Sequence, residues 1–168
     1  LVEILSYQNK VDNHLVCLPA CSFSYGTSYL RKKARGFWNQ YTAHNIDRFL
    51  EMTSAIELYG ETNISRFYLS HKDKSKCRNF IDMMKQIWDK RDIVIVEGNM
   101  THLGYGNDLF DNAKSIKRIL CPNMSAFGKY DLILETILSN TNANSLIVIA
   151  LGMTATVLAY DLAAQGRQ

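Results

Sequence analysis

Residues 93–112, IVIVEGNMTHLGYGNDLFDN, decide the fold expected of this chain. The consecutive β-branched residues Ile93 to Val96 form an apolar run bounded by a glycine, which is typical of a strand buried on both faces of a sheet. Glu97 and Gly98 follow the run directly. The residues beyond them are mainly glycines, amides and carboxylates, which predicts a polar loop with little to pack. A rigid strand that ends in such a loop is a candidate site.

The composition fits one globular domain. The chain has 168 residues, 47% of them hydrophobic and 21% charged, and a domain of this size can bury a core without disulfides or metals. The net charge of +3 does not indicate a nucleic-acid partner. The densest basic cluster, Arg31-Lys32-Lys33 with Arg35, lies beside aromatic residues and fits either a phosphate-facing patch or a solvated helix face.

Cysteine usage and hydropathy indicate a cytoplasmic protein. The cysteines lack the spacing and the nearby histidines of a zinc site, and we expect all of them to be reduced: Cys17, Cys21, Cys77 and Cys121. No signal peptide is expected. The longest apolar stretch, residues 145–164, contains a glycine, threonines and an aspartate, which argues against a membrane span.

Apolar runs suited to strands alternate with stretches of helical spacing. Strands are expected at His14–Cys17, Arg66–Leu69, Ile93–Val96, Ile116–Cys121 and Leu146–Leu151. Helices are expected over residues 74–90 and 126–138, and over a last segment that ends near Gly166. The alternation predicts parallel pairing with right-handed crossovers, hence an α/β layered fold. Both chain ends look cut, because the first residues resemble the end of a helix and a further strand would be expected after the last.

Ligands of an open parallel sheet bind beyond the carboxyl ends of its strands. At the end of the strand 93–96, Glu97 is costly to bury unless it is paired or binds a cation, so it is either functional or paired with an arginine such as Arg66 or Arg118. Gly98, Gly104 and Gly106 would let backbone N–H groups approach a phosphate or sugar, or would only form a tight turn. Their spacing matches neither a dinucleotide fingerprint nor a P-loop.

Other polar residues also allow two interpretations. Arg66 could bind a diphosphate or form a surface ion pair. Thr154 or Thr156 would cap the last helix, whose N–H groups could bind an anion, or would only complete a turn. Asp108 and Asp111 could serve a metal or a general base, or lie at a helix N-terminus. His102, in the loop, could reach a substrate or be solvent-exposed.

Four motifs together carry a family resemblance: R-D-I-V-I-V-E-G, G-x-G-N-D-L-F-D-N-A, S-I-x-R-I-L-C-P and a late Leu-Gly-x-Thr-Ala-Thr. With them the chain resembles the bacterial GT-D glycosyltransferase domain from about Arg66 to Gly166, and more loosely before that. The resemblance implies a Rossmann-like layered α/β fold with a mostly parallel sheet flanked by helices. It also implies transfer of a sugar, typically glucose from UDP-glucose, to glycans of bacterial surface glycoproteins or polysaccharides.

The resemblance implies site residues as well. It places Glu97 and Asp108 in the donor pocket, where their chemistry as carboxylates, and not the resemblance, makes them the expected catalytic groups. A set of further residues would bind the nucleotide sugar: Arg66, Gly98, Gly104, Gly106, Asn107, Asn112, Ser115, Lys117 and Thr154. A divalent cation, Mn²⁺, is expected as cofactor. The Asp-Gly-Glu element that holds it in the family is not in residues 1–168, which we otherwise interpret as a single domain that also lacks the family's last strand. Met153 stands where the family would have proline.

Two alternatives to a transferase remain. A non-catalytic domain of the same fold, binding a nucleotide sugar or a protein partner, would account for the absent Asp-Gly-Glu element. A nucleotide-dependent oxidoreductase is less compatible with the sequence, because no dinucleotide fingerprint follows any expected strand. The expected partners are a UDP-sugar donor and a glycan or glycoprotein acceptor, with no nucleic acid.

Overall fold

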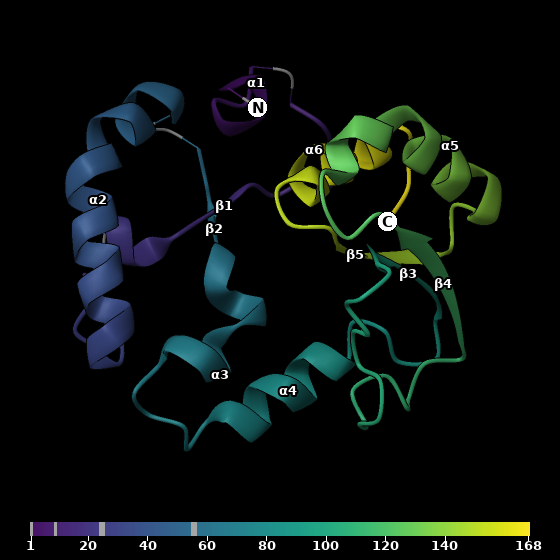
Figure 1. Ribbon diagram of the computed structural model, residues 1–168, viewed down its shortest axis with the longest axis horizontal. Helices are drawn as coiled ribbons and strands as arrows, with labels where there is room; N and C mark the ends of the chain where they lie inside the picture. Colours follow the sequence, from purple (N-terminus) through teal and green to yellow (C-terminus); the bar gives the residue numbers. More distant parts are fainter. Residues whose placement is uncertain (1, 9, 24–25, 55–56) are drawn as a thin grey trace. The chain divides into compact units, whose positions relative to one another are not determined.

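The computed structural model describes residues 2–8, 10–23, 26–54 and 57–168 (Figure 1). The chain forms two compact units, Leu1–Phe80 and Ile81–Gln168. Leu1, where the expected helix end begins, lies outside the described residues; α1, Val2–Leu5, follows it. The expectation of a single domain over residues 1–168 stays a prediction.

The second unit is built on a three-stranded parallel sheet. Its strands are β3 (Asp92–Gly98), β4 (Ser115–Cys121) and β5 (Leu146–Ala150), and they lie in the order β4-β3-β5. The central strand β3 is buried from Ile93 to Gly98, as its run of β-branched residues predicted. All three strands of this sheet were expected, and their parallel pairing confirms the α/β fold class.

Each face of the sheet has its own cover. Val94 and Val96 point to one face, where they pack with Ile119 and with α5, Tyr130–Asn140, and α6, Thr154–Ala164. Figure 1 shows these two helices on the same side of the strands. The helix expected over residues 126–138 is thus confirmed as η3, Ala126–Lys129, followed by α5. After α6 the chain turns at Gly166. Its φ of +71° lies in the left-handed region that favours glycine, and this agrees with the helix end expected near Gly166.

The opposite face is covered mainly by the loop that was expected to have little to pack. Ile93 and Ile95 contact Trp88 and Phe110, each 5% exposed, in a cluster that also includes Leu103 and Leu109. The loop between β3 and β4 therefore runs back along the sheet and supplies its second apolar layer. The sequence pattern failed here because isolated leucines and a phenylalanine, spaced without a period, carry the packing.

The first unit contains short strands and mostly short helices. Its elements are α1, β1 (Cys17–Leu18), η1 (Ala20–Ser22), α2 (Lys32–Met52), β2 (Gly60–Glu61), η2 (Thr62–Ser65) and α3 (Phe67–Ser70). The chain passes into the second unit through α4 (Cys77–Lys85). β1 and β2 pair in parallel. The basic cluster does begin a helix, α2, none of whose side chains is buried.

Two expected strands of this unit differ from the structure. Residues Arg66–Leu69 were expected as a strand but form the start of α3, because a four-residue apolar run does not distinguish a strand from a helical turn. Of His14–Cys17, only Cys17 lies in a strand. The helix expected over residues 74–90 is also shorter, since α4 ends at Lys85 and Ile87 is 53% exposed.

Across the part of the chain that the structure describes, no helix is both long enough and apolar enough to cross a membrane.

The core assignment predicts a contrast between two positions on α5. Ile137 is fully buried and Leu132 is 60% exposed. Ile137→Ala should lower the free energy of unfolding by about 2–5 kcal/mol because it leaves a cavity under the sheet, whereas Leu132→Ala should change it by less than about 1 kcal/mol. Urea unfolding of both variants measures this; equal losses would mean that α5 packs through another face.

Candidate functional site

The carboxyl ends of β3, β4 and β5 meet at one edge of the sheet. The strands are parallel, and their register pairs Glu97 with both Leu120 and Ala150. A methionine follows the end of each strand and is largely exposed: Met100 at 70%, Met124 at 80% and Met153 at 93%. Sequence reasoning did not single out Met100 or Met124, although their places just after two expected strands were visible.

Glu97 is the most buried charged group at this edge, with 1% of its surface exposed. Its Oε1 accepts a hydrogen bond from Nη1 of Arg118, and its Oε2 accepts one from the backbone N–H of Leu103 at 2.7 Å. Nη2 of Arg118 donates to the carbonyl of Leu103 at 2.8 Å, so that Glu97, Arg118 and Leu103 are each bonded to the other two. Of the two interpretations of Glu97, the structure therefore shows the ion pair with Arg118.

The strand periodicity explains this placement. Side chains alternate between the faces of a strand, so Glu97 shares a face with Ile93 and Ile95, under the loop. On β4, Arg118 pairs with Ile95 in register and points to the same face, whereas Ile119 and Cys121 point toward α5 and α6. The carboxylate and the guanidinium are thus brought together between the sheet and the loop.

The glycines of the loop have structural reasons to be glycine. Gly104 has φ +70°, and a Cβ there would lie 2.5 Å from Cδ2 of Phe110. Gly106 has φ +71° but open space around it. Asn107 accepts the N–H of Leu109 through Oδ1 at 3.0 Å, a local turn contact. The tight-turn interpretation accounts for Gly104 and Asn107, while the backbone at Gly106 faces open space.

Asp108 lies further along the loop and is paired. Its side chain is 62% exposed and Oδ2 lies 3.2 Å from Nζ of Lys85, which also donates to the Asp108 carbonyl at 2.7 Å. The helix start expected near Asp108 and Asp111 is instead a series of turns.

The residues present do not fit the expected divalent cation. Within residues 2–8, 10–23, 26–54 and 57–168, no three histidine, cysteine or carboxylate side chains come together as metal ligands. Glu97, the buried carboxylate at the edge, already accepts from Arg118 and from Leu103.

Two of the expected nucleotide-binding residues, Asn112 and Ser115, lie at the other end of the sheet, and a third, Lys117, points to the opposite face from Glu97. Ser115 begins β4 and its hydroxyl donates to Asp92, which begins β3, at 2.6 Å. This bond, followed by one from Lys114, holds the pKa of the Asp92 carboxyl below its usual value. Asn112 donates to the carbonyl of Lys85 at 2.8 Å, and Lys117 donates to Asn140. Since the ends of the seven-residue β3 lie about 20 Å apart, these residues do not gather around Glu97.

Arg66 and Thr154 also differ from expectation. Arg66 lies in the first unit as the exposed N-cap residue of α3. Thr154 is 7% exposed at the start of α6, and Met153, without a side-chain cap, is the N-cap residue. The expected threonine cap is therefore wrong, because the turn at Gly152, φ +56°, directs the first threonine into the core.

The exposed part of the loop near Glu97 carries two rings. The sequence analysis did not single out Tyr105, and it left two interpretations of His102. Tyr105 is 75% exposed and its ring lies 5.8 Å from Cζ of Arg118. His102, the only candidate histidine of the loop, lies 6.0 Å from the Tyr105 ring and is itself exposed. A glycine on each side of Tyr105 was the one signal for an exposed aromatic residue at a turn.

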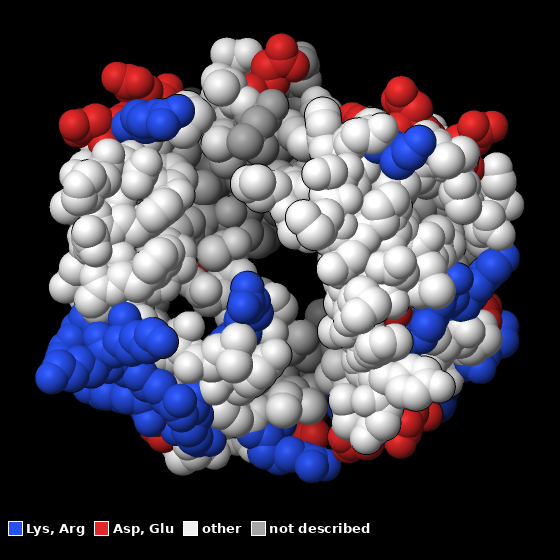
Figure 2. All heavy atoms as spheres, in the orientation of Figure 1, with Lys and Arg blue, Asp and Glu red and all other residues white. Residues whose placement is uncertain are grey.

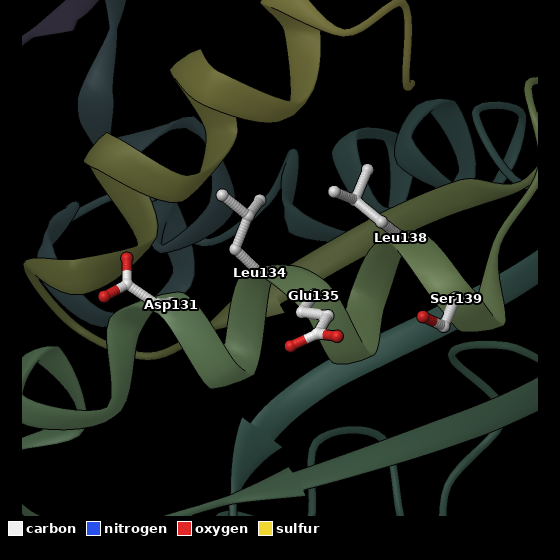
Figure 3. A pocket seen from close by; sticks show the side chains of 5 residues that line it. All are labelled: Asp131, Leu134, Glu135, Leu138 and Ser139. Atoms are coloured by element: carbon white, nitrogen blue, oxygen red, sulfur yellow. The ribbon is translucent and has the colours of Figure 1, made fainter.

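A separate hollow of about 410 Å³ lies against α5 and contains none of the expected site residues (Figure 3). Its lining comes from that single helix: Asp131, Leu134, Glu135, Leu138 and Ser139. Leu134 and Leu138 also pack against the core beside α6. A hollow along one helix, without converging groups from a second element, does not define a site.

A parallel α/β sheet with a glycine-bearing loop at its carboxyl edge is an architecture of nucleotide-binding proteins. The sequence model of the GT-D glycosyltransferase fold matches residues 1–168, and the chain belongs to this family.

Two named relatives support the assignment. The chain is 41% identical over 133 residues to the probable glycosyl transferase Gly of Streptococcus gordonii, and 40% identical over 169 residues to glycosyltransferase GlyD of Streptococcus pneumoniae serotype 4. These matches cover 79% and 99% of this chain but only 19% and 20% of the relatives. The chain thus spans about a fifth of the length of these two proteins.

Solved structures agree with the fold. A highly conserved domain of unknown function, described as having a distinct glycosyltransferase fold, superposes with a TM-score of 0.89 at 40% identity, covering 99% of this chain and 58% of that one. A glycosyltransferase from Streptococcus sanguinis superposes with a TM-score of 0.84 at 36% identity, covering 92% and 56%. The expected fold, a Rossmann-like parallel sheet flanked by helices, is confirmed by this similarity to solved structures.

The loop geometry predicts a difference between two glycines of similar φ. Gly104→Ala and Gly106→Ala should both lose about 1–2 kcal/mol to the positive φ. Gly104→Ala should lose about 1–3 kcal/mol more, since its methyl group meets the Phe110 ring. Chemical denaturation of both variants measures the difference. Equal losses would contradict the packing of Phe110 under Gly104.

Proposed function

We propose that this chain is the donor-binding part of a cytoplasmic glycosyltransferase. The donor is a UDP-sugar, glucose by family resemblance, and the acceptor is a glycan of a bacterial surface glycoprotein or polysaccharide. The observation that carries the proposal is the GT-D match over the whole chain, on a sheet whose carboxyl edge ends in a glycine-bearing loop. The cysteines are all free, which supports a reducing compartment.

The reaction is a displacement at the anomeric carbon. An acceptor hydroxyl forms the new C–O bond, the bond to the diphosphate breaks, and UDP leaves with the electron pair. The hydroxyl proton needs an acceptor, and the negative charge on the leaving diphosphate needs donors. We assign the backbone at Gly106 to the second task, because it faces open space and glycine lets an anion approach closely, while Gly98 and Gly104 shape the loop beside it.

Glu97 and Asp108 take different parts in this proposal. Glu97 is 1% exposed, and its two carboxylate oxygens are held by Arg118 and by the N–H of Leu103. Its part is therefore to hold the loop, and Asp108, with a side chain that is 62% exposed, is the group that takes the proton. Nζ of Lys85 lies 3.2 Å from Oδ2 of Asp108.

The competing function is a non-catalytic domain of the same fold. It is favoured by one observation, the lack of a three-residue metal-binding group among the described residues. The Mn²⁺ expected from the family stays a proposal, and no step of the reaction is assigned to it.

Donor binding is the direct test. We expect UDP-glucose to bind this chain in a calorimetric titration, with a Kd roughly in the micromolar to millimolar range, both with and without Mn²⁺. Glucose alone is the control and should not bind measurably. Absence of UDP-glucose binding in both conditions would contradict the placement of the donor pocket in this chain.

Asp108→Asn tests the proton acceptor. In a protein that contains this chain and transfers sugar, we expect the rate to fall by about 10²–10⁴-fold, with the unfolding free energy changed little. Asp111→Asn, also exposed and three residues further along the same loop, is the matched control and should keep the rate. If the Asp108 variant transfers at the wild-type rate, the assignment is wrong.

A further inference from the structure

The first part of the loop between β3 and β4, residues 98–107, presents an aromatic ring to solvent. Tyr105 is 75% exposed, and the reaction proposed above gives it no task. A tyrosine that is both exposed and held in place is typical of binding surfaces, because it offers a large amphipathic contact area and loses little conformational freedom when a ligand binds. Whether Tyr105 is such a residue depends on its supports and its neighbours.

Three contacts hold Tyr105 in place. Its N–H donates to the carbonyl of His102 at 3.1 Å, which closes a turn, and its ring lies 6.0 Å from the His102 ring. The guanidinium carbon of Arg118 lies 5.8 Å from the centroid of the Tyr105 ring. Arg118 is itself fixed by Glu97 and by the carbonyl of Leu103. The buried ion pair therefore supports a ring that is exposed to solvent.

The backbone of this turn is also unusual. His102 has φ +50°, and Gly104 and Gly106 have φ of +70° and +71°. Glycine adopts this left-handed region readily, whereas a histidine there is strained, and such strain is concentrated at functional sites. The surrounding contacts thus keep the turn in a conformation that presents Tyr105 between its two glycines.

The loop around the ring carries no acidic residue, lysine or arginine. Residues 98–107 contain no Asp, Glu, Lys or Arg. The guanidinium of Arg118 is paired with Glu97, and the next charged residue along the chain, Asp108, is negative. Figure 2 shows mainly uncharged surface where Figure 1 places this loop, at the lower right. The ring therefore suits a neutral ligand better than a phosphorylated or acidic one.

Exposed polar side chains accompany the ring on the same loop. Asn99, Thr101 and His102 carry groups that donate and accept hydrogen bonds, as the hydroxyls of a sugar do. The flat face of a tyrosine can pack against the apolar C–H face of a sugar ring. Small ligands such as nucleotides are usually bound in concave sites, whereas an open ring with polar neighbours suits one saccharide unit of a larger glycan.

We propose that Tyr105 is the platform on which a neutral saccharide unit of the acceptor packs. Arg118 supports the ring, and Asn99, Thr101 and His102 bind the hydroxyls of the sugar. That this sugar belongs to the acceptor rests on the proposed function, in which the backbone at the adjacent Gly106 binds the leaving diphosphate. A sugar on Tyr105 would then lie beside the donor, and Tyr105 would select an uncharged acceptor.

The first test is binding of saccharides to this chain, measured by NMR at its backbone amides. The probes are the neutral disaccharides maltose, lactose and N,N′-diacetylchitobiose, with glucose 1-phosphate as the charged probe. We expect at least one disaccharide to shift the amide signals of residues 101–107, with a Kd roughly in the millimolar range. Tyr105→Ala should weaken this binding about tenfold or more. Tyr105→Phe keeps the ring, and Leu132→Ala removes exposed apolar surface on α5, so both should stay within about threefold.

The second test separates the acceptor from the donor. In a protein that contains this chain and transfers sugar, Tyr105→Ala should raise the KM for the acceptor about tenfold, because it removes binding that is equal in the ground state and the transition state. The kcat and the Kd for UDP-glucose should stay within about threefold. A loss of UDP-glucose binding as large as the loss of disaccharide binding would overturn the proposal, since the ring would then belong to the donor site.

The NMR titration has its own contradicting outcomes. No shift with any neutral disaccharide, shifts with glucose 1-phosphate alone, or unchanged disaccharide binding by Tyr105→Ala would each overturn the platform. Disaccharide binding needs no donor, so the two proposals fail separately. A chain that binds a disaccharide at residues 101–107 but does not bind UDP-glucose keeps the platform and refutes the proposed donor site. A chain that binds UDP-glucose but no disaccharide does the reverse.

Discussion

A carboxylate buried near the end of the central strand of a sheet must be neutralised, and the second unit is arranged around that constraint. Burying an ion costs several kcal/mol unless its partners are close and complete. Glu97 meets this requirement with Arg118 of the neighbouring strand and with the backbone of Leu103. One group therefore ties together β3, β4 and the loop between them. Breaking it would leave a charge with no partner under the loop.

The same arrangement explains why the loop can carry function. Phe110 and Leu109 anchor its return along the sheet, and its first part, with Met100 and Tyr105, is presented to solvent at the edge. Rigid positioning of exposed groups on a buried scaffold is what a binding loop needs.

The sequence predicted those parts of the fold that depend on continuous patterns. The runs Ile93–Val96, Ile116–Cys121 and Leu146–Leu151 all lie in or cover strands, and the uninterrupted β-branched residues of the first suit the buried centre of a parallel sheet. The short run Arg66–Leu69 was wrong because its length does not separate strand from helix. The site was less predictable, since a motif does not reveal at which end of a strand a residue lies: Ser115 shares a motif with Arg118 but pairs with Asp92. For Glu97, the sequence named the correct partner but could not choose it over Arg66.

The most direct measurement of the central claim is hydrogen exchange at single backbone amides in Arg118→Met. If the buried pair with Glu97 holds the loop, exchange of the Leu103 amide and of its neighbours in the loop should accelerate, while the Ile95 amide in the middle of β3 stays protected. Unchanged exchange at Leu103 in a folded variant would contradict the claim, because the loop would then be held by Phe110 and its neighbours alone.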